Sequence, residues 1–447
     1  MRAEDAVLDV MMHGVFALDL VRSQRLNQIP ILELMRTPLA VNLGIFGVVV
    51  VWLCHQRHVR FGMTLFSIVC LLVMTGLVFT TVLLGACLLV WGLAVVLQMW
   101  ARRRGKHGLP LLAGWIVINA LYFPLFFVTL PTFDNIMVVG ELVLFWGPAF
   151  MVFRSLHYIH QCCKDRVDAL EAGALGAFLH YVLHFPSFWF GPYQTFRQFS
   201  DEVSNCKERM TWRNHLKGWG RILSGLVKFL IIFHFLNLDY FYNYGYFGPF
   251  AERMFAVEGS DDPLHLLFML YLFIIKIALF VSGLSDGVIG MNLLMGIRVP
   301  ENSNSPHLSR DILEFWRRWH IQAGVFLREE VFFPVGGMRR RRWAFFCVFA
   351  YSGFWHFPSV SAVLAFPLLQ LVLIELTLAW QAFWKRHEKR GDRIDAIGKR
   401  FYLHDSWLSG VLGIILVMHA NVLSAVLIHD HFFQGTRILP ILFGYIH

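Results

Sequence analysis

Long apolar segments alternate with short charged segments along most of this 447-residue chain. A helix needs roughly 17 or more apolar residues to cross the ~30 Å hydrocarbon layer of a bilayer. The segments that reach or approach this length cover residues 39–55, 63–100, 109–130, 136–159, 219–241, 264–281, 343–357, 360–383 and 407–428. Thr75 and Gly76 interrupt the longest of them and predict a hairpin of two helices there.

Shorter apolar segments occupy residues 172–190, 288–297 and 438–446. The first two suit half-helices or re-entrant segments, whose backbone must be satisfied by protein or by water. The pattern predicts an all-α, multi-pass integral membrane protein with about eleven spanning or half-spanning helices. Because no internal repeat or low-complexity linker interrupts it, we expect one membrane domain over residues 1–447.

The composition agrees with this pattern. Hydrophobic residues make up 57% of the chain and charged residues only 15%, whereas soluble proteins carry about 25% charged residues. The formal net charge of +9 could indicate nucleic acid binding. The basic residues lie in short loops between apolar segments, however, so we interpret them as topology signals and contacts to anionic lipid headgroups. No nucleic acid partner is expected.

Charge alternates between successive loops. The loops around residues 102–106, 207–217, 310–342 and 385–400 are basic, whereas those around 129–135 and 243–263 are acidic or neutral. Positive loops face the cytoplasm, so we predict a multi-pass protein of the cytoplasmic (inner) membrane with residues 251–263 outside. The N-terminal residues include Glu4, Asp5 and Asp9 and lack a clean apolar core, so a removable signal peptide is not expected.

Several chemistries lack their motifs. The seven cysteines form no C-x-x-C pair, which argues against a zinc site or a disulfide framework. His180 and His184 have metal-ligand spacing but no third ligand at suitable spacing, so no metal is expected. No serine hydrolase elbow is expected, and G-x-x-x-x-G-K does not occur, which argues against a P-loop.

The segment from residue 282 to 356 combines polar groups with apolar stretches. Residues 300–306 are rich in helix breakers and predict a loop. Ser309 then predicts an N-cap with Asp311 in the first turn, and one helix is expected from Ser309 to Phe333. Its many charges are unfavourable in lipid, so we expect it to lie along the membrane surface or to bury only its middle. In that helix Trp316, Trp319 and His320 would share one face.

Two further polar residues stand in apolar surroundings. His356 ends the apolar segment 343–357, and Asp286 interrupts the apolar run before residue 297. Ionisable groups at membrane depth are functional-site hypotheses by default. A neutral imidazole can accept a proton near physiological pH, which suits activation of a hydroxyl group.

The motifs of this region resemble those of the membrane-bound O-acyltransferase superfamily. The resemblance rests on SDGVIG, PENSNSP, FWRRWHI, FFPVGG and GFWH in that order, preceded by FPSFWFGPYQTFRQF at residues 185–199. It covers about residues 155–366, and the PVGG segment is similar to the alginate O-acetylation branch. It departs at Phe357, where many relatives have glycine, and at Gln322-Ala323-Gly324.

The resemblance implies a fold, with helices around a polar central funnel, and a set of site residues. His356 would be the catalytic histidine and His320 the supporting one. Asp286, Asn302, Trp316, Trp319 and Trp355 are candidates for binding substrate or lining the cavity. No tightly bound cofactor is expected, because the acyl thioester donor, either acetyl-CoA or an acyl carrier, is a substrate.

The implied function is transfer of a short acyl group, most simply acetyl, from a cytoplasmic thioester to a hydroxyl of an extracytoplasmic cell-envelope glycan. Families of this type often act with a separately encoded extracytoplasmic partner. Two alternatives stay open. One is D-alanyl transfer to teichoic acid, and the other is a non-enzymatic transporter or scaffold of a glycan secretion complex.

Overall fold

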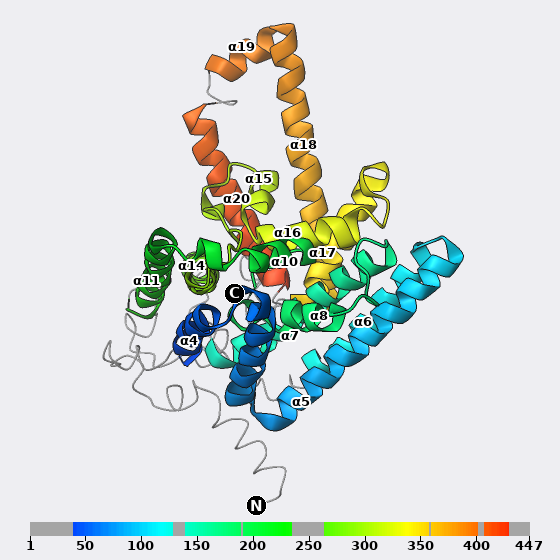
Figure 1. Ribbon diagram of the computed structural model, residues 1–447. Coiled ribbons are helices and arrows are strands. Elements are labelled where there is room, and N and C mark those ends of the chain that lie inside the picture. The colour runs from blue at the N-terminus through cyan, green and yellow to red at the C-terminus, as the bar shows by residue number, and fades with distance from the viewer. Residues whose placement is uncertain are drawn as a thin grey trace, which may run out of the picture. The chain divides into compact units, whose positions relative to one another are not determined.

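The computed structural model describes residues 39–127, 139–188, 191–234, 263–356, 359–400 and 406–428 (Figure 1). Throughout these residues the ordered elements are helices, with no strand among them. The chain forms two compact units. The first comprises Met1–Pro249 with Phe280–Pro300, and the second comprises Phe250–Leu279 with Glu301–His447.

The first unit is built on one very long helix. Helix α5 (Val59–Arg104) packs against α7 (Val139–Cys163) and α8 (Ala174–Leu183), and α6 (Gly108–Phe127) packs against α7. The remaining elements are α4 (Leu39–Leu53), η2 (Gln56–His58), α9 (Phe185–Phe188), α10 (Phe196–Ser204), η4 (Lys207–Arg209) and α11 (Trp212–His234). Helix α14 (Pro263–Leu294) contributes its second half.

The predicted hairpin at Thr75–Gly76 is wrong, because α5 is helical through both residues. A single glycine inside a helix costs only about 1 kcal/mol, which does not open a loop. Figure 1 shows that α5 instead changes direction between its darker and lighter blue parts. The helix ends at Gly105, whose φ of 59° is a conformation that glycine adopts without strain.

The predicted separate half-helix at 288–297 is also wrong, since residues 263–294 form one helix. Its polar side chains are satisfied without a break. The Ser285 hydroxyl donates to Val281 O at 2.8 Å, and the Asn292 amide donates to Val288 O at 2.9 Å. Glycines also let α14 approach α11 closely: a Cβ at Gly225 would lie 2.7 Å from Gly283 O.

The second unit contains the histidine-bearing segment. Its elements are η5 (Pro306–Leu308), α15 (Ile312–Arg318), α16 (Ile321–Leu327), the π-helical turn η6 (Arg328–Phe332), η7 (Gly337–Arg340), α17 (Arg341–His356), the π-helical turn η8 (Ser361–Ala365), α18 (Phe366–Arg390), α19 (Arg393–Arg400) and α20 (Trp407–Ile428). Helices α18 and α20 contact each other, and Figure 1 shows them drawing together away from α19.

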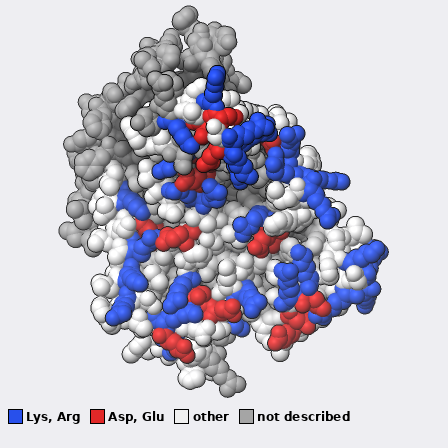
Figure 2. Space-filling view, turned by 90° about the horizontal axis from the view of Figure 1, so that it is seen from above, with Lys and Arg blue, Asp and Glu red and all other residues white. Residues whose placement is uncertain are grey.

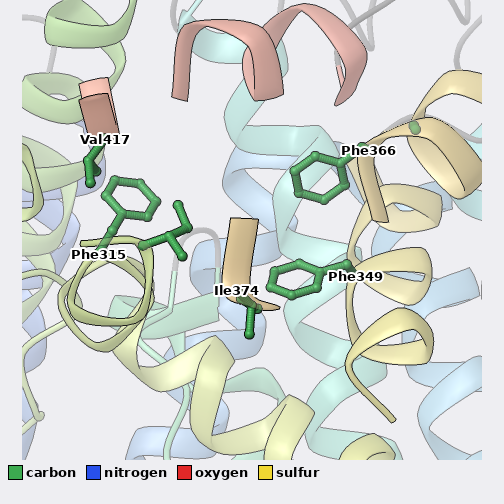
Figure 3. Packing of buried hydrophobic residues seen from close by; sticks show 7 residues of the cluster. Phe315, Phe349, Phe366, Ile374 and Val417 are labelled. Atoms are coloured by element: carbon green, nitrogen blue, oxygen red, sulfur yellow. The ribbon is translucent and has the colours of Figure 1, made fainter. Parts of the chain in front are cut away.

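A compact apolar cluster holds this second unit together. Figure 3 shows its side chains, which come from α15, α17, η8, α18 and α20. The buried members are Ile312, Phe315, Phe349, Ala362, Phe366, Ile374 and Val417. Because one cluster joins five elements, it fixes the helices that carry the two candidate histidines relative to one another.

Four helices are long and apolar enough to cross a membrane within the described residues: Thr80–Arg104, Ile274–Leu294, Ser361–Arg390 and Trp407–Leu427. They expose large apolar side chains on one side, as expected for contact with lipid, for example Leu368, Val372, Leu376, Leu412, Ile415 and Leu416. The all-α, membrane-protein prediction is confirmed, whereas the number of about eleven helices stays a prediction. The predicted short apolar segment at 438–446 and the loop at 243–262 lie outside the described residues.

Candidate active site

The predicted single helix from Ser309 to Phe333 is broken at His320. Helix α15 ends at Arg318, α16 begins at Ile321, and His320 between them has φ 45° and ψ 46°. The N-cap is Asp311 rather than the predicted Ser309, because the Asp311 carboxylate accepts from Glu314 N at 2.8 Å. The periodicity continues across the break, so the pattern alone could not reveal it.

The preceding loop explains why the helix breaks there. Asn304 N donates to Arg318 O at 2.8 Å, and Ile321 N donates to Asn302 O at 2.8 Å. These bonds satisfy helix-terminal groups that a continuous helix would otherwise pair internally. The left-handed conformation of a non-glycine residue costs about 1–2 kcal/mol, and the two bonds offset that cost. The loop that contains Asn302, which is 4% exposed, therefore sets the position of His320.

One aromatic ring, that of Trp319, contacts the His320 ring. The Trp319 ring lies beside it with centroids 4.5 Å apart, and Trp319 in turn stacks on Phe315 at 6.2 Å. The sequence predicted that Trp316, Trp319 and His320 share one helix face. That prediction is wrong, because the helix breaks at His320. Trp319 still contacts His320, whereas Trp316 belongs to the packing behind it.

Trp316 is held by a line of buried polar side chains. Its indole Nε1 donates to Gln370 Oε1 at 2.9 Å, and Gln370 Nε2 donates to Ser424 Oγ at 2.6 Å. The line connects α15 to α18 and α20. Gln370 is fully buried and Ser424 is 6% exposed. The sequence analysis missed both residues, although a polar residue inside an apolar segment was the signal that singled out Asp286.

His356 is the last residue of α17, and its tautomer is defined. Its Nδ1 lies 2.7 Å from Ser352 O. Because a carbonyl oxygen only accepts, Nδ1 must carry the proton. In the neutral ring, Nε2 then bears the lone pair. Trp355, beside it, is buried and packs edge-on against Phe354 with centroids 5.6 Å apart.

The glycine of the GFWH motif has a packing role. A Cβ at Gly353 would lie 1.9 Å from Ala362 O, a distance that no side chain tolerates. Glycine therefore permits α17 to approach the π-helical turn η8 one turn before His356. At the other end of α17, Arg341 pairs with Glu375 of α18 at 2.7 Å. The histidine thus ends a helix that is fixed at both ends, as a site of defined geometry requires.

The two histidines influence each other electrostatically. Burial lowers the pKa of His320 from its ordinary value of 6.5 to about 3, and the charge of a protonated His356 lowers that pKa further. Both side chains nevertheless retain some accessible surface. A desolvated ring that is still accessible can meet a small reacting group.

We expect acid to destabilise the protein through His320. Its pKa in the folded state lies below its unfolded value, so between pH 6.5 and about 3 the unfolded chain binds a proton that the folded chain does not. Stability is therefore complete above pH 6.5 and falls as the pH drops, by up to about 2 kcal/mol near pH 5. Melting temperatures of the purified protein at pH 7.5 and pH 5 should show this decline. His320→Gln should decline less; an equal decline would contradict the assignment.

Asp286 belongs to the first unit, whereas the two histidines belong to the second. It is 2% exposed, and its carboxylate pairs with Arg221 at 2.8 Å and with Lys228 at 2.6 Å. Ser224 Oγ also donates to it at 2.8 Å. These three partners lie on one face of α11. The structure thus gives Asp286 an ion-pair role between α11 and α14.

The spacing of His180 and His184 brings their rings to 5.4 Å centroid distance on α8. His184 Nε2 donates to Asn292 Oδ1 at 2.8 Å. Among the described residues, no third histidine, cysteine or carboxylate forms a ligand group with this pair. A structural zinc site uses four such ligands, so these two residues do not fit one.

The architecture and the two buried histidines define a helical membrane protein with a candidate acid–base site. The family model of the membrane-bound O-acyltransferases matches residues 117–404. The chain therefore belongs to the membrane-bound O-acyltransferase family.

Named relatives fall into three groups. A probable alginate O-acetylase AlgI of Pseudomonas syringae pv. tomato is 28% identical over 256 residues, covering 56% of this chain and 44% of the relative. A teichoic acid D-alanyltransferase of Streptococcus thermophilus is 28% identical over 196 residues, covering 43% and 44%. A peptidoglycan O-acetyltransferase of Helicobacter pylori is 31% identical over 194 residues, covering 41% and 34%. The chain spans about half the length of the relatives it matches.

Proposed function

We propose that this chain transfers a short acyl group, most simply acetyl, from a cytoplasmic thioester to a hydroxyl of an extracytoplasmic cell-envelope glycan. The observation that carries the proposal is the geometry of His356. Its Nδ1–H donates to Ser352 O, which orients the ring and assigns the lone pair to Nε2. The names of the relatives support an O-acyl product on an envelope polymer.

In the proposed reaction, His356 Nε2 accepts the proton of the acceptor hydroxyl while its oxygen attacks the thioester carbonyl carbon. The tetrahedral intermediate then collapses with cleavage of the C–S bond. The imidazolium returns the proton to the leaving thiolate, so the products are an O-acyl ester and a free thiol. If the acyl group is first transferred to a partner protein and then to the glycan, His356 acts as the base in both transfers.

His320 serves this reaction as a neutral group. With a pKa of about 3, its ring carries no charge near pH 7 and can orient or polarise a reacting group by hydrogen bonding. A neutral second imidazole also avoids placing a positive charge beside His356, which would disfavour proton acceptance there. Trp319 and the 301–304 loop are positioning elements in this scheme.

The similarity to teichoic acid D-alanyltransferases supports the second candidate, D-alanyl transfer. The chemistry at His356 would be the same, and only the acyl group and acceptor would differ. The PVGG motif at residues 334–337, which resembles the alginate branch, favours acetyl. A separately encoded extracytoplasmic partner is part of the proposal for either acyl group.

The function is tested by deleting the gene and analysing the envelope polymers of the strain. Mass spectrometry after mild alkaline release distinguishes ester-linked acetyl from D-alanine. We expect one polymer to lose its O-acyl groups and to regain them when the wild-type chain is supplied. Unchanged O-acylation of every polymer would contradict acyl transfer and favour a transporter or scaffold role.

We expect a cytoplasmic location for the basic segments of the second unit, including α19. Lys and Arg side chains are abundant on the face shown in Figure 2, and positive loops stay inside. Single cysteines at 385–400 should resist an impermeant maleimide in intact cells, whereas cysteines at 251–263, of which only Pro263 is among the described residues, should react. The chain without introduced cysteines is the control. The reverse labelling pattern would overturn the topology.

A further inference from the structure

Helix α20 contains a buried amide group that has no partner. Asn421 is 6% exposed, and its Nδ2 donates no hydrogen bond within the part of the chain that the structure describes. The residue lies within the candidate span Trp407–Leu427. A buried polar group without a partner costs about 1–3 kcal/mol. In a membrane-spanning segment, such groups are most often functional.

The position of Asn421 is defined by its neighbours on the helix. Val417, Asn421 and Ser424 are spaced i, i+4 and i+7 and are all buried, so they share one face. Val417 packs into the apolar cluster with Phe315 and Phe366, and Ser424 accepts from Gln370. This face of α20 is therefore directed toward α15 and α18. The opposite face exposes Leu412, Ile415 and Leu416.

Asn421 thus stands beside the polar line that begins at Trp316. Each of the other members has a partner within the line: Trp316 donates to Gln370, and Gln370 donates to Ser424. Trp316 is separated from His320 by only three residues, and the Phe315 ring contacts both Trp316 and Trp319, which in turn contacts His320. An apolar surrounding with a few placed polar groups is the usual composition of a ligand site. The unpartnered amide is the group in this set that a ligand can still satisfy.

We propose that Asn421 binds the acceptor hydroxyl of the glycan and so helps to determine acceptor specificity. This inference rests on the proposed acyl transfer. A carboxamide has an NH2 group that donates and a carbonyl oxygen that accepts, so it can bind a hydroxyl group, which does both, whereas a thioester carbonyl only accepts. The Asn421 amide donates to the hydroxyl oxygen, and the hydroxyl proton stays available to His356.

The test compares two nearly isosteric variants, Asn421→Ser and Asn421→Ala, in the deletion strain. Both leave a similar space, but only serine retains a group that donates and accepts. We expect Asn421→Ala to lower the O-acyl content per molecule of enzyme about tenfold or more, the loss of one hydrogen bond to a buried group. Asn421→Ser should retain more acylation. Equal acylation by the two variants, or wild-type acylation by Asn421→Ala, would overturn the proposal and indicate a structural water or a packing role.

Melting temperatures of the purified chain give a readout that is independent of activity. Asn421→Leu removes an unpartnered amide and should not lower the melting temperature, whereas Ser424→Ala removes a formed hydrogen bond and should lower it. A marked fall for Asn421→Leu would contradict the unpartnered state. If the deletion strain itself keeps normal O-acylation, the proposed function fails. If the deletion strain loses O-acylation and the Asn421→Ala chain restores it fully, the proposed function stands and this inference alone fails.

Discussion

We expect replacement of His356 with alanine to abolish acyl transfer while leaving the chain in the membrane at normal abundance. Loss of a general base typically lowers the rate about 10²–10⁴-fold. The fold does not depend on this ring for its core, because the apolar cluster is formed by other residues, such as Phe349 and Phe366. The measurement is the O-acyl content of the envelope polymer in the complemented deletion strain, with the protein quantified by immunoblot.

Two further variants sharpen this result. His356→Asn retains an amide that can donate to Ser352 O in place of Nδ1–H, yet it offers no basic nitrogen, so it should be as inactive as His356→Ala. His307, an exposed histidine in η5, is the matched control, and His307→Ala should acylate normally. Near wild-type acylation by His356→Asn would contradict the role of His356 as a proton acceptor.

We expect replacement of His320 to impair transfer as well, and the backbone geometry allows the ring and the conformation to be tested separately. His320 has φ 45°, which glycine adopts without strain and alanine does not. We expect both His320→Gly and His320→Ala to lose most acylation, by less than His356→Ala. The glycine variant should be the more stable of the two by about 1 kcal/mol.

The comparison of these two variants separates chemistry from folding. If the loss in His320→Ala came from backbone strain alone, His320→Gly would restore acylation at normal abundance. That recovery would contradict a role for the ring. Equal loss in both variants, with a higher melting temperature for glycine, is the expected result.

The sequence predicted the bounds of uniformly apolar helices well. It predicted poorly where helices begin, end and break in the polar segments. The segment predicted at residues 407–428 is α20, because a long apolar run between charged ends admits few alternatives. The break at His320 depends on backbone hydrogen bonds with Asn302, which accepts, and Asn304, which donates; both are remote in sequence from the helix termini they satisfy. Helical periodicity carries no information about such long-range partners.

The candidate site also combines features that the sequence predicted with features that depend on long-range partners. Motifs identified His356, but the tautomer follows from Ser352, and the approach of η8 follows from Gly353. Asp286 was singled out as a charge in an apolar run, and the structure pairs it with Arg221 and Lys228. A charged residue in such a run indicates a requirement for a partner, and the sequence does not show whether that partner is substrate or protein.

The proposed activity is acyl transfer with His356 as the base. Its most direct test uses membrane vesicles from the deletion strain that contain either the wild-type chain or His356→Asn at equal abundance. The vesicles are supplied with radiolabelled acetyl-CoA, and label is measured in the isolated envelope polymer. We predict ester-linked label with the wild-type chain and background label with His356→Asn. Equal labelling of the polymer by the two chains would contradict the account.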